Sequence, residues 1–244
     1  MLESGAVGTW TSLSDPAVAE MAAAGEFDFV VVDTEHAPLG LETVGNCLRA
    51  VEAGGSDAIV RVPWNDPVRI KRLLDLGPSG LLVPMVDDAD EAEAVVAATR
   101  YPPAGIRGVA GARASDYGRS MGSYFARDHA ELTTIPQIET STGVENCEAI
   151  AAVDGVDALF VGPADLSASL GVFGQWDDPE LHDAIEAVIA AGENEGIPVG
   201  TLATSPARLK DLGSLGFDYM ISGVDTAMLV AGQRRAYEDA TDVL

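Results

Sequence analysis

The sequence predicts an α/β protein whose 244 residues form a single (β/α)8 TIM-barrel domain over residues 1–244. Short apolar segments alternate with Ala-rich helical segments eight times along the chain, the pattern of repeated β-α units. The apolar segments are almost continuously hydrophobic, as is typical of parallel strands covered on both faces. An open doubly wound sheet is the alternative. It usually has a glycine-rich phosphate turn after its first strand, and Thr9-Trp10-Thr11-Ser12 is not one.

The expected elements follow one another in strict alternation. Strands are expected at 6–10, 27–33, 57–62, 80–85, 133–139, 158–162, 198–202 and 219–222. Helices are expected at 15–24, 41–53, 66–76, 88–99, 143–152, 178–195, 204–214 and 225–240. Three of these helices begin with an Asp cap followed by Pro in the first turn, at Asp15-Pro16, Asp66-Pro67 and Asp178-Pro179.

A longer segment at 101–131 lies between the fourth and fifth expected strands. It contains the arginines Arg107, Arg113, Arg119 and Arg127. Long insertions in compact barrels are usually functional, so we expect an active-site cover or a subunit contact.

The charge balance excludes several partners. The chain has 39 acidic and 14 basic residues, a net charge of −25, so it should repel nucleic acid and anionic membranes. It shows no signal peptide and no apolar run long enough to span a bilayer, so we expect a soluble, cytoplasmic protein. Cys47 and Cys147 are expected to be reduced, buried thiols. The dispersed acidity suggests a halophilic protein of a salt-rich cytoplasm, where screening weakens self-repulsion.

His36 is the histidine best placed for chemistry. It follows the apolar run Phe29–Val32 and stands beside Asp33 and Glu35, which could orient it or raise its basicity. Histidine titrates near neutral pH and suits proton transfer, but a structural cap is an equally good interpretation of an isolated strand-end histidine. The other two, His129 and His182, lie among helix-like polar residues.

Other polar residues also end apolar strands, and a barrel brings such residues to one face. They are Trp10, Asp33, Arg61, Gln137, Glu139 and the run Gly162-Pro163-Ala164-Asp165. Arg61 is either part of an internal salt bridge or a guanidinium aimed at a carboxylate or enolate.

Glu139 and Asp165 would repel each other unless a cation lies between them, which favours Mg²⁺ or Mn²⁺. The alternative is that both cap the helices that follow. Gly162 to Asp165 could also present backbone N–H groups to a substrate carboxylate.

The sequence lacks the motifs of several other classes of enzyme. The sequence has no HExxH zinc motif, no Walker P-loop and no G-x-S-x-G nucleophile elbow. Both lysines, Lys71 and Lys210, lie in expected helices beside Arg72 and Asp211, so a Schiff-base lysine is not expected. A metal ion must then polarise the substrate.

These motifs, in this order, resemble the HpcH/HpaI aldolase family of metal-dependent class II pyruvate aldolases. The similarity runs from about Gly8 to past Asp225. The matching segments are Asp33-Thr34-Glu35-His36-Ala37-Pro38, Arg61-Val62-Pro63-Trp64-Asn65-Asp66, Leu74-Asp75-Leu76-Gly77, Leu82-Val83-Pro84-Met85-Val86, 100–108, Gln137-Ile138-Glu139-Thr140 and 162–167.

The resemblance implies a (β/α)8 barrel in a homo-oligomer, a hexamer or trimer, whose C-terminal helices exchange between subunits. It implies that Glu139 and Asp165 bind a divalent cation, Mg²⁺, Mn²⁺ or Co²⁺. It also implies that His36 is the general base and that Arg61 stabilises an enolate. The substrate contacts it implies are Gln137 and the backbone of Ala164, beside Gly162, Asp165 and Trp10 in the same cleft. Asp75 resembles the carboxylate that raises the basicity of the histidine through a subunit contact; the residues alone favour Asp33, and both stay open.

The expected activity is a reversible aldol cleavage by a carbon–carbon lyase. A 4-hydroxy-2-oxo acid chelates the metal, His36 removes the C4 hydroxyl proton, and the C3–C4 bond breaks to release an aldehyde and a pyruvate enolate. The alternatives are a CoA-thioester lyase of the citramalyl-CoA type and a non-catalytic metabolite-binding barrel. The loop at 108–113 is tighter than in the family and is expected near the cleft, so the sequence does not identify the aldehyde.

Overall fold

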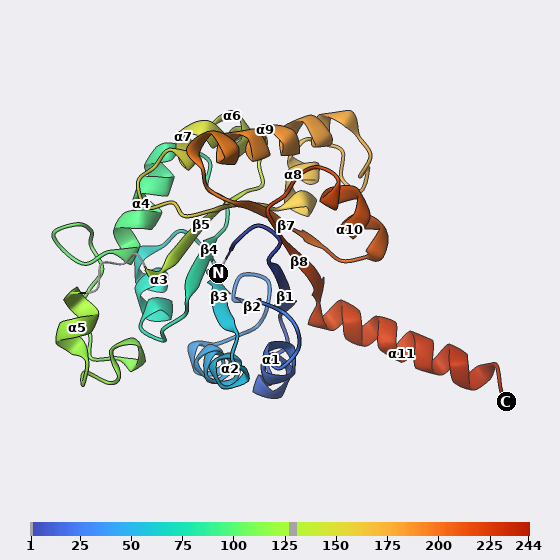
Figure 1. The fold of residues 1–244 in the computed structure, drawn as a ribbon, viewed down its shortest axis with the longest axis horizontal. Coiled ribbons are helices and arrows are strands. Elements are labelled where there is room, and N and C mark those ends of the chain that lie inside the picture. Colours follow the sequence, from blue (N-terminus) through green and yellow to red (C-terminus); the bar gives the residue numbers. More distant parts are fainter. Residues whose placement is uncertain (1, 127–130) are drawn as a thin grey trace.

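The computed structural model describes residues 2–126 and 131–244, and it confirms the predicted closed barrel (Figure 1). Its parallel strands follow in chain order around the barrel, and the last pairs with the first. They are β1 (Val7–Thr11), β2 (Phe29–Asp33), β3 (Asp57–Arg61), β4 (Gly80–Val83), β5 (Thr133–Ile138), β6 (Leu159–Val161), β7 (Val199–Ala203) and β8 (Tyr219–Val224).

Helices surround the strands on the outside of the barrel (Figure 1). They are α1 (Pro16–Ala23), α2 (Leu41–Gly54), α3 (Pro67–Leu74), α4 (Ala89–Thr99), the 3-10 helix η1 (Arg113–Ser115), α5 (Met121–Ala126), α6 (Ser141–Glu145), α7 (Cys147–Ala151), α8 (Pro163–Ser169), α9 (Pro179–Glu195), α10 (Pro206–Gly213) and α11 (Asp225–Thr241). The three predicted Asp caps are confirmed: Asp15, Asp66 and Asp178 each accept a backbone N–H of the first turn.

Two helix predictions were wrong. The helix expected at 143–152 is broken into α6 and α7 at Asn146, whose side-chain amide donates to the Asp87 carbonyl at 2.8 Å. Helix α8 was not predicted at all. Its first turn contains Pro163, and it buries Leu166 and Ser167. The run at 162–165 is therefore the start of a helix and not an open loop.

The barrel interior is closed at its amino-terminal end by two aromatic rings. Phe29 and Tyr219 begin β2 and β8, and their ring centroids lie 6.1 Å apart. Gly8 and Gly200 make room for them, because a Cβ at either position would lie within 2.3 Å of a ring atom. A functional cavity of the barrel is therefore expected at the other, carboxyl-terminal end.

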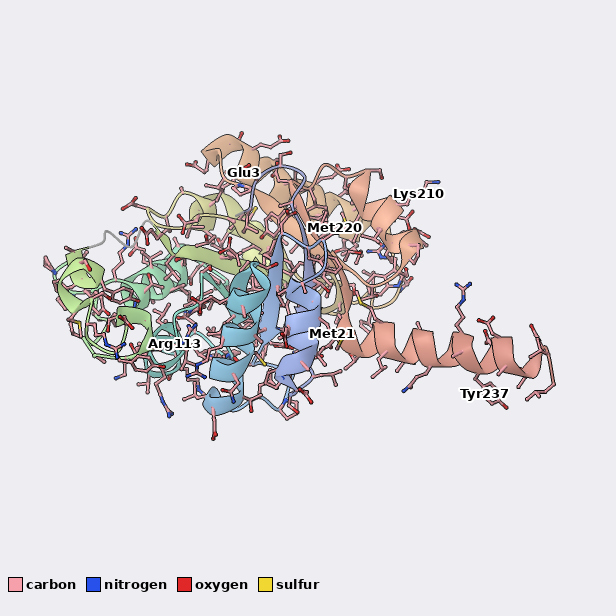
Figure 2. All side chains as sticks on the ribbon, turned by 60° about the horizontal axis from the view of Figure 1, so that its bottom comes forward. Glu3, Met21, Arg113, Lys210, Met220 and Tyr237 are labelled. Carbon is pink, nitrogen blue, oxygen red and sulfur yellow. The ribbon has the colours of Figure 1, made fainter. Side chains whose placement is uncertain are left out.

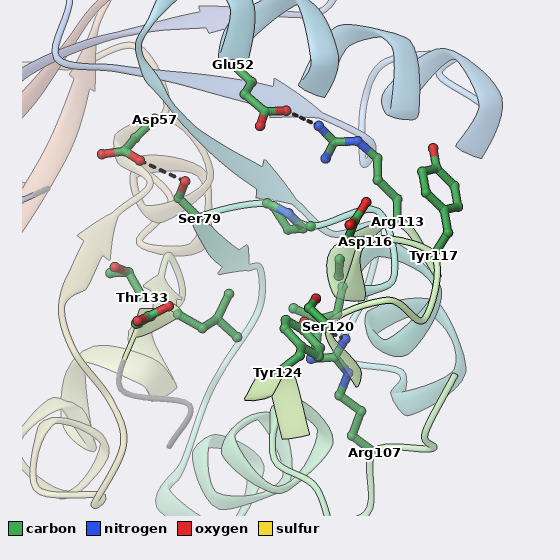
Figure 3. A pocket seen from close by; sticks show the side chains of 16 residues that line it. Glu52, Asp57, Ser79, Arg107, Arg113, Asp116, Tyr117, Ser120, Tyr124 and Thr133 are labelled. Carbon is green, nitrogen blue, oxygen red and sulfur yellow. Dashed lines mark hydrogen bonds and ion pairs between the residues drawn. The ribbon is translucent and has the colours of Figure 1, made fainter. Parts of the chain in front are cut away.

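The insertion after α4 lies at the amino-terminal end of the barrel. A cavity of about 820 Å³ lies there. Figure 3 shows its lining, with Asp57, Ser79 and Thr133 from the strand starts and Arg107 and Arg113 from the insertion. The prediction that 101–131 covers the active site is therefore wrong within the protomer. The physical reason is that α4 returns the chain to the strand starts before the insertion begins. The predicted subunit contact stays a prediction, and Arg127 and His129 lie outside the described residues.

Helix α11 extends away from the barrel as a single rod (Figure 1). All residues from Thr226 to the C-terminus are exposed, and Tyr237 points into solvent far from the barrel (Figure 2). The helix start is held by Asp225, whose carboxylate accepts hydrogen bonds from the Thr11 hydroxyl and the Ser12 backbone at 2.7 and 3.0 Å. In the described part of the chain, no helix combines the length and apolar character needed to cross a bilayer.

Candidate active site

A cavity of about 520 Å³ opens at the carboxyl-terminal ends of the strands. Most of the residues predicted from strand ends line it, and these are Trp10, Asp33, His36, Arg61, Gln137, Gly162, Ala164 and Asp165. Glu139 directly follows β5 and contacts the Gln137 side chain. The barrel thus brings together residues that are up to 155 positions apart in the sequence, counted from Trp10 to Asp165.

Arg61 and Asp33 form a buried two-point ion pair. Arg61 donates Nε to Asp33 Oδ1 at 2.9 Å and Nη2 to Oδ2 at 2.7 Å. The two residues are register partners on β3 and β2, so the sheet itself sets this contact. Burial alone would raise the pKa of Asp33, but the hydrogen bonds and charge of Arg61 outweigh it and hold that pKa below its usual value. Asp33 is therefore an anion at neutral pH.

Arg61 also contacts Glu35 and Trp10. Its Nη1 lies 2.8 Å from Glu35 Oε2, an ion pair without hydrogen-bond alignment, and its guanidinium lies 4.6 Å from the centre of the Trp10 ring. Burial raises the pKa of Glu35 despite the nearby charge of Arg61. The internal salt bridge predicted for Arg61 is present. A guanidinium has more N–H groups than these contacts use, so it can still donate to a ligand in the cavity.

His36 lies at the cavity wall with 68% of its side chain exposed. Its Nε2 is 3.8 Å from Glu35 Oε1, a distance for weak electrostatic contact. Asp33 Oδ1 accepts the backbone N–H groups of Glu35 and His36 at 3.0 and 3.4 Å. Asp33 therefore fixes the loop that carries His36 through its backbone N–H groups. The ring is free to meet a substrate.

Glu139 is a buried carboxylate, only 3% exposed. Its Oε1 accepts the backbone N–H of Met85 at 2.9 Å, and its Oε2 accepts a hydrogen bond from Gln137 Nε2. Met85 has φ of 55°, an unusual conformation for a residue with a side chain, and it directs this N–H at Glu139. Burial, together with the charges of Asp165 and Glu35, raises the pKa of Glu139 to about 7 against the two hydrogen bonds, which lower it.

Gly162 and Asp165 complete this side of the cavity. A Cβ on Gly162 would lie 2.7 Å from both Glu139 Oε2 and Gln137 Nε2, so glycine leaves the carboxylate its space. The Gly162 N–H donates to the Ile138 carbonyl at 3.1 Å, so among 162–165 the first-turn N–H groups of Ala164 and Asp165 remain for a ligand. Asp165 is exposed in the first turn of α8.

The helix-cap alternative for Glu139 and Asp165 is wrong. Thr140 caps α6 by accepting the Gly143 N–H at 2.9 Å. Gly162 occupies the cap position of α8, and Asp165 lies three residues further on. Both carboxylates are therefore free of the structural role that competed with metal binding.

The residues present fit a divalent cation. Four carboxylates lie in the cavity or against its lining residues, those of Asp33, Glu35, Glu139 and Asp165, and they outnumber the two lining arginines, Arg61 and Arg208. A buried carboxylate with a raised pKa, such as that of Glu139, gains strongly from a nearby cation. The Gln137 Oε1 atom is buried without a hydrogen-bond partner. Among the described residues no group of three or more His, Cys, Asp or Glu side chains forms a complete cage. A site of two carboxylates, completed by substrate oxygens and water, is the arrangement that hard cations such as Mg²⁺ accept.

Asp75 is not brought to His36 within the protomer. It lies at the end of α3, where its Oδ1 is 3.4 Å from Arg107 Nη2. Arg107 lines the amino-terminal cavity and also donates to the Tyr124 hydroxyl at 3.1 Å. A role of Asp75 in tuning His36 therefore requires a second subunit.

Sequence reasoning missed the far wall of the cavity. Phe160, Trp176, Ser205 and Arg208 line it. Ser205 and Arg208 belong to the start of α10, and Trp176 lies in the segment before α9. The helix was predicted at 204–214, but a polar residue inside a helix carries no strand-end signal that would place it at the cavity.

Comparison with known proteins shows the family of this chain and agrees with its fold. Residues 6–231 match the family model described as HpcH/HpaI aldolase/citrate lyase. A 4-hydroxy-2-oxo-heptane-1,7-dioate aldolase of Salmonella dublin is 43% identical over 228 residues, which cover 93% of this chain and 86% of that protein. An HpcH/HpaI aldolase/citrate lyase family protein of Burkholderia cenocepacia J2315 is 37% identical with a TM-score of 0.93, over 98% of this chain and 95% of that one. The HpcH/HpaI aldolase of Desulfitobacterium hafniense DCB-2 is 28% identical with a TM-score of 0.88, over 98% and 93%.

Proposed function

Because this chain belongs to the HpcH/HpaI aldolase family and is a carbon–carbon lyase, we propose that it cleaves a 4-hydroxy-2-oxo acid to pyruvate and an aldehyde in a reversible, divalent-metal-dependent reaction. The observation that carries the proposal is the cavity lined by His36, Arg61 and Asp165, with the buried carboxylate of Glu139 in contact with the lining residue Gln137. These are an acid–base group, a cation for developing negative charge, and a cation-binding pair.

Glu139 and Asp165 are the proposed ligands of the ion, which we expect to be Mg²⁺, Mn²⁺ or Co²⁺. Gln137 and the Met85 N–H hold the Glu139 carboxylate in place. Gly162 leaves room beside that carboxylate for the ion and the oxygens of a 2-oxo acid. When bound, such an ion polarises the 2-oxo group and so favours the enolate.

His36 and Arg61 are the proposed acid–base and charge-stabilising groups. His36 takes the proton of the C4 hydroxyl, the C3–C4 bond breaks, and the aldehyde leaves while the bonding electrons remain on the pyruvate enolate. The free N–H groups of Arg61 stabilise the negative oxygen of the enolate, and protonation at C3 gives pyruvate. The ion pairs with Asp33 and Glu35 hold the guanidinium still before the charge develops.

The remaining cavity residues are proposed to bind the pyruvate part. Gln137 contacts Glu139, and Ala164 directly precedes Asp165 in the cavity lining. The Trp10 ring lies against the Arg61 guanidinium, with 4.6 Å between the ring centre and the guanidinium carbon. Gly162 keeps this part of the wall flat against the substrate.

A direct assay tests the function. The protein is freed of metal with a chelator and incubated with 4-hydroxy-2-oxo acids, sugar-derived and dicarboxylic, with Mg²⁺, Mn²⁺ or Co²⁺ added, and pyruvate is measured. We expect pyruvate only when metal is present. Full activity in the presence of chelator would overturn the metal mechanism, and acetyl-CoA release from a CoA ester without pyruvate would favour the CoA-lyase alternative.

The arginines that such a CoA site would use already face carboxylates: Arg107 faces Asp75, Arg113 faces Glu52 and Arg119 faces Asp116.

We also propose that the active form is a homo-oligomer in which α11 packs against a neighbouring subunit. The exposed apolar side chains Met228, Leu229 and Val230 support this, since an isolated helix of this length is marginally stable in water. A neighbouring subunit could also bring Asp75 to His36. Light scattering of the full chain and of a chain ending at Val224 tests the assembly: we expect the shorter chain to form a smaller species, and equal sizes would contradict the proposal.

A further inference from the structure

We propose that Arg208 is a specificity-determining residue that binds an anionic group at the far end of the aldehyde part of the substrate. The proposal rests on the aldolase function proposed above and identifies the substrate class more closely: a 4-hydroxy-2-oxo acid with a terminal carboxylate or phosphate. Arg208 was not among the site residues that the sequence indicated.

The position of Arg208 is the first support. It lies on α10, which follows β7, and it lines the same cavity as His36 and Arg61. Strands β3 and β7 are four places apart in a closed barrel of eight, so they lie on opposite sides of its mouth. Arg61 ends β3, and Arg208 therefore faces it across the cavity. A substrate bound at the carboxylate pair can extend from one wall towards the other.

The second support is that Arg208 lacks an anion. Its Nη2 atom is buried and has no hydrogen-bond partner, whereas the guanidinium of Arg61 is held by two carboxylates. Asp211 and Asp177 are near enough to favour the charged form, yet in the part of the chain that the structure describes no carboxylate forms an ion pair with Arg208. A guanidinium that is partly removed from water and lacks a partner gains strongly from binding an anion.

The third support is that the guanidinium is held in place without an anion. It lies 4.7 Å from the centre of the Trp176 ring. Trp176 is fixed in turn, because its carbonyl is 3.0 Å from His182 Nε2 and its ring meets Phe173 edge-on at 6.4 Å. A cation stacked on a fixed ring keeps its planar face of N–H donors oriented, which suits two-point recognition of a carboxylate or phosphate.

The wall between the two arginines is suited to a short carbon chain. Phe160, Leu202 and Val224 line this part of the cavity, and the volume of about 520 Å³ is typical of a small-molecule site. The carboxylates near Arg61 would repel a second anion on the substrate. Arg208 therefore offers the terminal anion a position away from them.

The test compares anionic with neutral aldehydes in the aldol addition of pyruvate. The probes are succinate semialdehyde, glyceraldehyde 3-phosphate and pentanal, and the readout is the ratio of kcat/KM for each anionic aldehyde to that for pentanal. We expect Arg208→Gln to lower the ratio for at least one anion by about ten- to a hundredfold, the loss of a charge-assisted hydrogen bond. The anionic aldehyde whose kcat/KM ratio falls identifies the recognised group as a carboxylate or a phosphate.

Lys210→Gln is the matched control, because it removes the same charge from the same helix at a side chain that points into solvent (Figure 2). We expect it to leave the ratio at the wild-type value. Arg208→Lys keeps the charge but lacks the planar set of donors, and we expect an intermediate ratio. If Arg208→Gln does not fold, Arg208→Lys replaces it in the comparison with the wild type.

Equal ratios in the wild type and in both Arg208 variants would overturn the proposal, as would a wild type that prefers pentanal. Exchange of the pyruvate C3 protons with heavy water by the wild type tests the aldolase function independently of the role of Arg208. Exchange without preference for an anion overturns only the role of Arg208. Absence of both exchange and aldol addition overturns the aldolase function itself.

Discussion

Arg61 and Asp33 are register partners on β3 and β2, and their side chains meet in a two-point ion pair with N–O distances of 2.9 and 2.7 Å. The contact depends on strand pairing and not on a flexible loop. It couples the stability of the barrel mouth to the direction of the guanidinium that faces the cavity.

Removing one partner of this pair should weaken the fold. We expect Asp33→Ala to lower the free energy of unfolding by about 3–5 kcal/mol, because it leaves a buried guanidinium with Glu35 alone. Urea unfolding measures the change. Arg119→Ala is the control: its ion pair with Asp116 is exposed, and we expect a loss below about 1 kcal/mol. Similar losses for the two variants would show that burial does not strengthen the Arg61–Asp33 pair.

Two substitutions by the neutral residue glutamine should distinguish the proposed base from the proposed metal ligand. We expect His36→Gln to reduce kcat for aldol cleavage by about a hundredfold to ten-thousandfold, because the variant lacks the proposed base. Mn²⁺ binding should be retained, because the His36 side chain is exposed and its replacement should leave the folded protein intact. Glu139→Gln should lose both activity and Mn²⁺ binding. Calorimetric titration with Mn²⁺ and a pyruvate-release assay measure the two properties. Loss of Mn²⁺ binding in the His36 variant would assign that residue to the metal and not to proton transfer.

The raised pKa of Glu139 predicts a link between pH, metal and stability. A carboxyl whose pKa rises to about 7 on folding favours its protonated form, so its stabilising effect is present at low pH and is lost as pH rises towards and above 7. For metal-free protein we expect a loss on the order of 3 kcal/mol from this group between pH 4.5 and 7. Added Mg²⁺ should restore the melting temperature more at pH 8 than at pH 6.

The control for this pH effect is Glu139→Gln, which is neutral at every pH. Its melting temperature should depend less on pH between 5 and 8 than that of the wild type, and Mg²⁺ should leave it unchanged. An identical pH dependence of the two proteins would mean that other groups cause the effect.

The net charge of −25 predicts that salt stabilises the protein. At low ionic strength like charges repel over long distances, and salt at about 1 M shortens that range to about 3 Å. We expect the melting temperature to rise steadily with KCl up to molar concentrations. A parallel titration with sucrose controls for general exclusion effects on stability. A protein most stable at low salt would contradict the halophilic adaptation that the charge predicts.

The sequence predicted most of the cavity because of how strands end. A polar side chain directly after a buried apolar run is where the chain leaves the core, and in a parallel barrel all such points share one end. His36, Arg61, Gln137, Glu139 and Asp165 carry this signal, and the fold brings four of them to one cavity with Glu139 against Gln137.

The sequence by itself determined the barrel, the order of its strands and the identity of the polar strand ends, because hydrophobic periodicity and Asp-Pro helix starts are local properties of the chain. Only the tertiary structure decided which charges pair. It assigned Asp33 to Arg61, moved Asp75 and the insertion to the opposite end of the barrel, and placed Arg208 unpaired in the cavity. The physical reason is that ion pairs and cavity walls depend on distances between side chains from distant elements, and those distances exist only once the barrel closes.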